Sequence, residues 1–123
     1  MAIDQEPDTT GAPLRRFTDP AYRPLCGNLA EVRENIDALD RKIVALLAER
    51  GRYVKDAARF KRDAFQVSAP QRQQEVIDKV RALAEKEGAY PEVVEAAYRA
   101  LIAGFIAREQ RDHQGMDDVD AKP

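Results

Sequence analysis

Two cationic residues, Arg50 and Lys61, stand within a stripe of apolar residues that recur at helical spacing. At about 100° per residue, Arg50 falls about 20° from Ile43 and Lys61 falls almost in line with it. The cations are about three turns apart, which is about 16 Å along a helix. Burying an unpaired cation costs free energy, so these positions call for a negative partner. Together the two side chains could bind one small anionic molecule; alternatively, they extend to water or pair with acids of the chain.

Arg33 flanks the same stripe, at about 80° from Ile43. About 25 Å of helix separates Arg33 from Arg50, which is too far for both to contact one small ligand from the same chain. Arg33 can therefore share a site with Arg50 only if a second chain supplies it. An antiparallel pairing of two first helices would do so and would create two equivalent sites.

Glu109 lies near the end of the last predicted helix, on its inward face, about 20° from Ile102. A negative charge is disfavoured at the C-terminal end of a helix because of the helix dipole. An inward acid there either pairs with a cation or stays protonated. The alternative is an exposed acid where the helix frays.

Other kinds of site chemistry have no support in the sequence. His113 is the single histidine and lies near the end of the last helix, where we expect it to be solvated rather than catalytic. Cysteines, histidines and acids do not recur at the spacing of a metal site. There is no glycine-rich phosphate loop and no recognisable nucleophile–base pair. We therefore expect neither a metal nor a cofactor.

The apolar stripe predicts a first helix over residues 29–62. Asn28 and Glu31 have the spacing of an N-cap residue and its acidic N3 partner. At about 1.5 Å per residue such a helix is about 50 Å long, more than a domain of this size can cover by itself. A partner is therefore expected, most simply a second copy of the chain. The stripe consists of Leu29, Val32, Ile36, Leu39, Ile43, Leu46, Leu47, Val54, Ala57 and Ala58.

Two further helices are predicted. Pro70 suits the start of the second, Gly88 suits its C-terminal stop, and Pro91 opens the third. The predicted class is all-α, a three-helix chain with a long first helix. We expect residues 1–27 to form a partly irregular N-terminal arm, residues 28–113 the helical domain, and residues 114–123 a disordered acidic tail.

The composition excludes several classes of function. The 20 basic and 22 acidic residues leave a net charge of −2, so a global basic field for nucleic acid is absent. No apolar run has the length of a membrane span. Cys26 is the single cysteine and no signal-like apolar segment precedes it. We therefore expect a cytoplasmic protein with no disulfide, no nucleic-acid partner and no membrane partner.

Three motifs follow one another in the first predicted helix: VRENIDALD at Val32–Asp40, LLAER at Leu46–Arg50 and YVKDAARFK at Tyr53–Lys61. APQR at Ala69–Arg72 and the end of the third helix add to them. On these residues, the segment Leu29–Gln110 resembles the all-helical chorismate mutase family, which includes isochorismate pyruvate lyases. The resemblance implies an intertwined homodimer of three-helix chains.

The resemblance also implies roles for four residues. Arg33 would reach across the dimer to one carboxylate of a dianionic substrate, and Arg50 would bind the other. Lys61 would donate to the ether oxygen that gains negative charge as its C–O bond breaks. Glu109 stands where relatives carry Gln or Glu as a second donor to that oxygen. Because a carboxyl group can donate only while protonated, Glu109 would have to hold a proton.

Arg72 and Gln73 stand where many mutases carry an Arg–Glu pair, whose Glu contacts the hydroxyl group of the substrate ring. Gln73 departs from that pattern, while the YVK and APQR segments are closer to the lyases. The resemblance thus implies a chorismate mutase that rearranges chorismate to prephenate, with an isochorismate pyruvate lyase as the alternative. A non-catalytic helical dimerisation module, whose inward cations are paired internally, is a second alternative.

Overall fold

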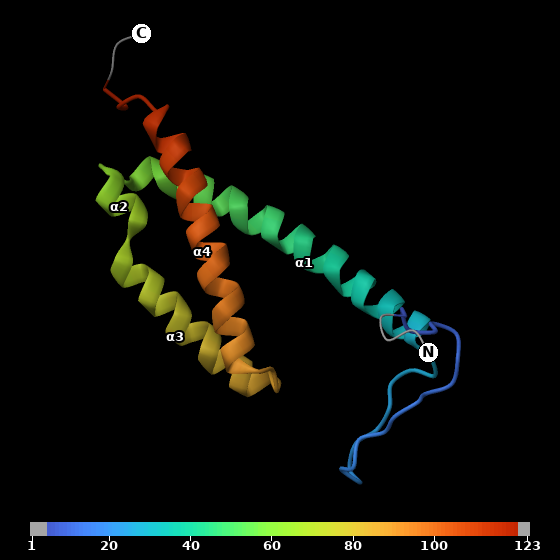
Figure 1. The fold of residues 1–123 in the computed structure, drawn as a ribbon. Helices are drawn as coiled ribbons and strands as arrows, with labels where there is room; N and C mark the ends of the chain where they lie inside the picture. Colours follow the sequence, from blue (N-terminus) through green and yellow to red (C-terminus); the bar gives the residue numbers. More distant parts are fainter. Residues whose placement is uncertain (1–4, 121–123) are drawn as a thin grey trace. The chain divides into compact units, whose positions relative to one another are not determined.

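The computed structural model describes residues 5–120, which form helices and connecting segments without a β-strand (Figure 1). The elements are α1 (Leu29–Ala57), the 3-10 helix η1 (Ala58–Phe60), α2 (Ala64–Ser68), α3 (Pro70–Glu87) and α4 (Pro91–Gln114). The predicted all-α class with three main helices and a long first helix is confirmed. The chain divides into two compact units, Met1–Ala48 and Glu49–Pro123, and each is described by itself.

In the first unit, α1 begins with the predicted cap. The Asn28 side chain accepts a 2.9 Å hydrogen bond from the backbone N–H of Glu31, and the Glu31 carboxylate accepts one of 3.1 Å from the N–H of Gly27. The N–H of Glu31, which the helix itself leaves without a partner, and the N–H of Gly27 just before the helix are thereby satisfied. The irregular segment before α1 adds a third bond, because the Thr9 carbonyl accepts from the N–H of Ala30 at 2.9 Å.

The apolar stripe of α1 in the first unit is exposed. None of the residues of α1 is buried. Val32, Ile36, Leu39 and Ile43 keep between 38% and 56% of their surface accessible. A row of large apolar side chains at this exposure is typical of a surface that another molecule covers.

In the second unit, α4 is the central element and packs against α3, α2 and η1. Its core is small and aliphatic. The buried apolar residues are Ala58, Val67, Ile77, Val80, Ala84 and Ile102. The predicted limits of α3 are confirmed: Pro70 is its first residue, and Gly88 follows it with φ 73°, a left-handed conformation that glycine adopts without strain.

The prediction that the first helix continues to residue 62 is wrong. The α-helix ends at Ala57, η1 follows, and Lys61 is extended with φ −109° and ψ 133°. The reason is a second helix start that the prediction did not include. Asp63 caps α2 by accepting a 3.0 Å hydrogen bond from the N–H of Gln66, whose side chain accepts one of 2.6 Å from the N–H of Arg62. Asp63 and Gln66 have the spacing of a capping box, and that is the signal in the sequence.

Within residues 5–120, no helix combines the length and the apolar character that a bilayer span requires.

Candidate active site

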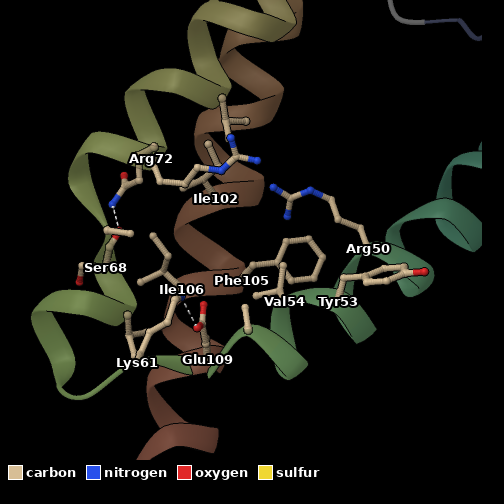
Figure 2. Close-up of a pocket in the computed structure, with 15 residues that line it drawn as sticks. Arg50, Tyr53, Val54, Lys61, Ser68, Arg72, Ile102, Phe105, Ile106 and Glu109 are labelled. Carbon is tan, nitrogen blue, oxygen red and sulfur yellow. Dashed lines mark hydrogen bonds and ion pairs between the residues drawn. The ribbon is translucent and has the colours of Figure 1, made fainter. Parts of the chain in front are cut away.

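A cavity of about 320 Å³ lies within the second unit, between the end of α1, the segment around Lys61, the α2–α3 junction and α4 (Figure 2). This volume is at the lower end of the range for small-molecule sites. Apolar side chains from α1 and α4 form much of the wall. The charged residues that line the cavity are Arg50, Lys61, Arg72 and Glu109. Three cations and one acid leave the lining with a net positive charge.

Arg50 has an unsatisfied buried hydrogen-bond donor. Its Nη1 atom is inaccessible to solvent and has no hydrogen-bond partner in the part of the chain that the structure describes. Instead, the guanidinium lies over the Phe105 ring at 5.0 Å and near the Tyr98 ring at 6.0 Å. Aromatic faces attract a cation but do not replace a hydrogen-bond acceptor. The two rings therefore hold the guanidinium in place and leave its Nη1 group without an acceptor.

Arg72 completes the cationic wall. Figure 2 shows its guanidinium and that of Arg50 pointing toward one another. The acid next to Arg72 is Glu75, whose carboxylate lies 3.7 Å from Nη1, and both side chains are more than half exposed. Two facing guanidinium groups repel each other, and a shared carboxylate would relieve that repulsion by binding both.

Lys61 and Glu109 form the other polar feature of the cavity. The Lys61 ammonium donates a 2.8 Å hydrogen bond to Oε2 of Glu109. The side chains of Lys61 and Glu109 are 22% and 4% exposed, respectively. Glu109 is therefore an inward acid paired with a cation, and the alternative of an exposed acid at a frayed helix end is excluded. Because the acid is almost fully desolvated, removing its partner would be costly.

His113 is not the solvated residue that we expected. It is half-buried, and its Nε2 lies 2.7 Å from the backbone carbonyl oxygen of Lys61. His113 follows Glu109 by one helical turn, so the two side chains leave the same face of α4. The sequence places them on one face. It does not indicate that His113 contacts the Lys61 carbonyl, because that carbonyl lies outside a helix only if α1 ends before Lys61.

Gln73 lines the cavity, but its amide is already engaged. The Nε2 group donates a 2.6 Å hydrogen bond to the carbonyl of Ser68. The junction there includes Ala69, a residue with the left-handed φ of 44° that ends α2 and precedes Pro70. With its N–H group bound to the backbone, Gln73 can offer its side-chain carbonyl as an acceptor.

Arg33 is the one candidate that does not line this cavity. It belongs to the first unit, and its side chain is exposed on α1. The structure thus brings together five of the six residues singled out from the sequence. These are Arg50, Lys61, Arg72, Gln73 and Glu109.

Three contributors to the site were not recognised from the sequence. By their spacing, Phe105 and Tyr98 belong only to the apolar face of the last helix, although Phe105 precedes Glu109 by one turn on that face. Gln110 follows Glu109 directly in α4. Its amide donates to the Ala64 carbonyl at 2.8 Å and to Ser68 Oγ at 3.2 Å, which ties α2 to α4.

Asp63, the cap of α2, is stabilised in its ionised form. The hydrogen bond from the Gln66 N–H to the carboxylate lowers the pKa of Asp63 below its ordinary value. In residues 5–120 no group of three or more His, Cys, Asp or Glu side chains is arranged to hold a metal ion.

The fold and the site together define a helical protein with a net positively charged cavity of small-molecule size. Residues 32–110 match the family Chorismate mutase type II, so the chain belongs to this family. It is 36% identical to an isochorismate pyruvate lyase of Pseudomonas aeruginosa over 84 residues, which is 68% of this chain and 83% of that protein. It is 37% identical to a chorismate mutase of Methanocaldococcus jannaschii over 59 residues, which is 47% of this chain and 60% of that protein.

Proposed function

We propose that the cavity binds chorismate and that the protein catalyses its rearrangement to prephenate. The observation that carries this proposal is the buried Nη1 group of Arg50, which has no acceptor among residues 5–120, on a guanidinium that points toward that of Arg72 (Figure 2). A carboxylate would satisfy that donor and bridge the two cations. Family membership supplies the substrate class, because the family is named for chorismate mutase.

The rearrangement is pericyclic, so it requires no nucleophile and no proton abstraction. The protein instead holds the substrate in a compact reactive conformer and stabilises the charge that develops as the C–O bond breaks. Arg50 would bind one carboxylate through the fork of its guanidinium. The ammonium of Lys61 would donate to the ether oxygen, where negative charge accumulates.

Glu109 would be the second donor to the same oxygen. In the structure it accepts a hydrogen bond from Lys61, as an ionised carboxylate does. To donate, it must first take up a proton. An ionised carboxylate would repel an ether oxygen that gains negative charge, so the proposed second donor is the carboxylic acid form of Glu109.

The complete site would belong to a homodimer. The exposed stripe of α1, which includes Ile36, Leu39 and Ile43, offers a long apolar surface for the same surface of a second copy. An antiparallel pairing of two such helices would bring Arg33 of one copy to the cavity of the other. Arg33 would then bind the second carboxylate of the substrate.

The second candidate is an isochorismate pyruvate lyase, which would convert isochorismate to salicylate and pyruvate. Two observations favour it. Gln73 stands where many mutases carry a Glu, so a carboxylate contact to the ring hydroxyl of chorismate is missing. The similarity to the lyase of Pseudomonas aeruginosa also extends over more of both chains than the similarity to the mutase. The charge arrangement suits both reactions.

A product assay tests these proposals. Purified protein is incubated with chorismate and, separately, with isochorismate, and the products are identified by chromatography. Prephenate from chorismate at the higher kcat/KM supports the mutase, and faster formation of salicylate with pyruvate supports the lyase. Absence of turnover with both substrates would contradict an enzymatic function and leave a helical dimerisation module.

A further inference from the structure

We propose that His113 is a positioning residue that holds Lys61 in place for catalysis. The inference rests on the proposed function, in which the Lys61 ammonium meets the ether oxygen of the substrate. Its structural basis is the 2.7 Å contact between His113 Nε2 and the Lys61 carbonyl oxygen. A carbonyl only accepts, so Nε2 carries the hydrogen and donates it.

Lys61 needs such a partner because it lies outside regular helix. Its backbone is extended, and its N–H group donates to the Ala58 carbonyl at 3.2 Å. A carbonyl inside a helix would accept from the N–H group four residues later. The carbonyl of Lys61 accepts instead from a side chain of α4, 52 residues further along the chain. The position of Lys61 is thus tied to α4 rather than to α1.

Helix α4 holds Lys61 at two points. Glu109 accepts a hydrogen bond from Nζ at 2.8 Å, and His113 donates one to the carbonyl oxygen at 2.7 Å. The two residues are one turn apart on the same helix face, so a single rigid element fixes both ends of the lysine. The contact to Glu109 must weaken when that acid donates to the substrate. The contact to His113 does not involve the ammonium and persists through that step.

The expected consequence is specific to the chemical step. Substrate carboxylates would be bound chiefly by arginines, and Lys61 would act on charge that develops in the transition state. Loss of the His113 contact should therefore lower kcat and leave KM nearly unchanged. A misplacement of a catalytic group by a fraction of its hydrogen-bond length is enough to reduce the rate.

Two substitutions at the same position separate the hydrogen bond from the bulk of the side chain. In His113→Gln the amide N–H can reach about as far as Nε2, and in His113→Asn it stops one methylene group short. Exposed Arg111, on the same turn of α4, is changed in the control variant Arg111→Ala. Each full-length variant is first checked for native helix content and thermal unfolding.

Two readouts are then compared: the steady-state kcat and KM, and the rate at which acetic anhydride acetylates Lys61, measured by mass spectrometry. In His113→Asn we expect kcat to fall about tenfold, as for the loss of about one hydrogen bond, with little change in KM. We also expect faster acetylation of Lys61 in that variant. His113→Gln and Arg111→Ala should behave like the unmodified chain in both readouts.

Each other outcome has a definite meaning. If Lys61 is acetylated at the same rate in the Asn and Gln variants, His113 does not hold it, whatever the activity. If the acetylation rate rises in His113→Asn while kcat stays constant, the hydrogen bond from His113 to Lys61 has no part in catalysis, and the proposal is overturned. If the unmodified chain converts neither substrate, the proposed function fails, and the acetylation rates still decide whether His113 holds Lys61.

Discussion

Lys61 and Glu109, 48 residues apart in the chain, meet in a 2.8 Å ion pair on the wall of the cavity. The acid is almost completely buried, whereas the lysine keeps about a fifth of its surface accessible. The pair places two groups that can donate a hydrogen bond, an ammonium and a carboxyl group in its protonated form, next to each other on the cavity wall. Only one of them, the ammonium, can donate while the pair stays ionised, and this asymmetry has a measurable consequence.

Glu109→Gln should at least retain activity, because the amide can donate to the ether oxygen without first taking up a proton. Glu109→Leu, which has no donor, should be weakly active. The measurement is kcat/KM for the two variants and the unmodified chain. If the Gln and Leu variants lose activity equally, donation from position 109 has no part in the mechanism.

Arg50→Ala should reduce kcat/KM by about 100-fold or more, which corresponds to about 3 kcal/mol for a lost charge-assisted contact to a carboxylate. Stability should change little, because none of the ion pairs among the described residues involves Arg50, so its removal leaves no acid unpaired. Thermal unfolding and kinetics on the same preparations check both points. A loss of several kcal/mol in stability would instead identify Arg50 as a structural ion-pair partner.

Arg33→Ala and Arg50→Ala homodimers should both be nearly inactive, yet mixing them should restore activity. If Arg33 acts across the dimer, a mixed dimer has one intact site and one doubly altered site. Unfolding and refolding the two chains together in equal amounts should then give about a quarter of the unmodified activity, because half of the dimers are mixed. Restoration would not occur if both arginines served the same chain's site, since each site would then carry one substitution.

Gly51 lies so close to Phe105 that a Cβ at Gly51 would meet Cε1 of that ring at 3.0 Å. Gly51→Ala should therefore displace the ring on which the Arg50 guanidinium lies and raise KM several-fold. Gly104→Ala is the matched control, because nothing lies within 4 Å of its Cβ position. That variant should gain about 1 kcal/mol of helix stability with unchanged KM. An equal KM in both variants would show that Phe105 does not position Arg50.

Asp63→Asn tests the cap of α2. The pKa of Asp63 is lowered in the folded chain, so the folded state binds fewer protons there than the unfolded state. Its stabilising effect is therefore present above the unfolded pKa and is lost as the pH falls through the folded value. The unmodified chain should unfold at a higher temperature than Asp63→Asn near neutral pH, and this difference should vanish in acid. A difference that is constant with pH would mean that the charge of Asp63 does not contribute.

Much of the fold could be predicted because its signals are local. Asn28 and Glu31 cap one helix, Pro70 and Gly88 delimit another, and each of these residues acts on backbone groups within a few positions of itself. The prediction failed where local signals compete. The apolar period continues past Ala57, but Asp63 and Gln66 begin a new helix. The segment between Ala57 and Asp63 cannot belong to both helices.

The sequence by itself indicates which charged residues form the site, because cations and an acid on apolar helix faces need partners wherever they lie. Arg50 and Glu109 could be singled out by helical angle alone. Lys61 was singled out by an angle that does not apply to it, since it lies beyond the end of α1. What only the tertiary structure decided is which groups meet: Lys61 with Glu109 and His113, and Arg50 with Phe105. These contacts join segments about 50 residues apart, and no periodicity within one helix can specify how another helix packs against it.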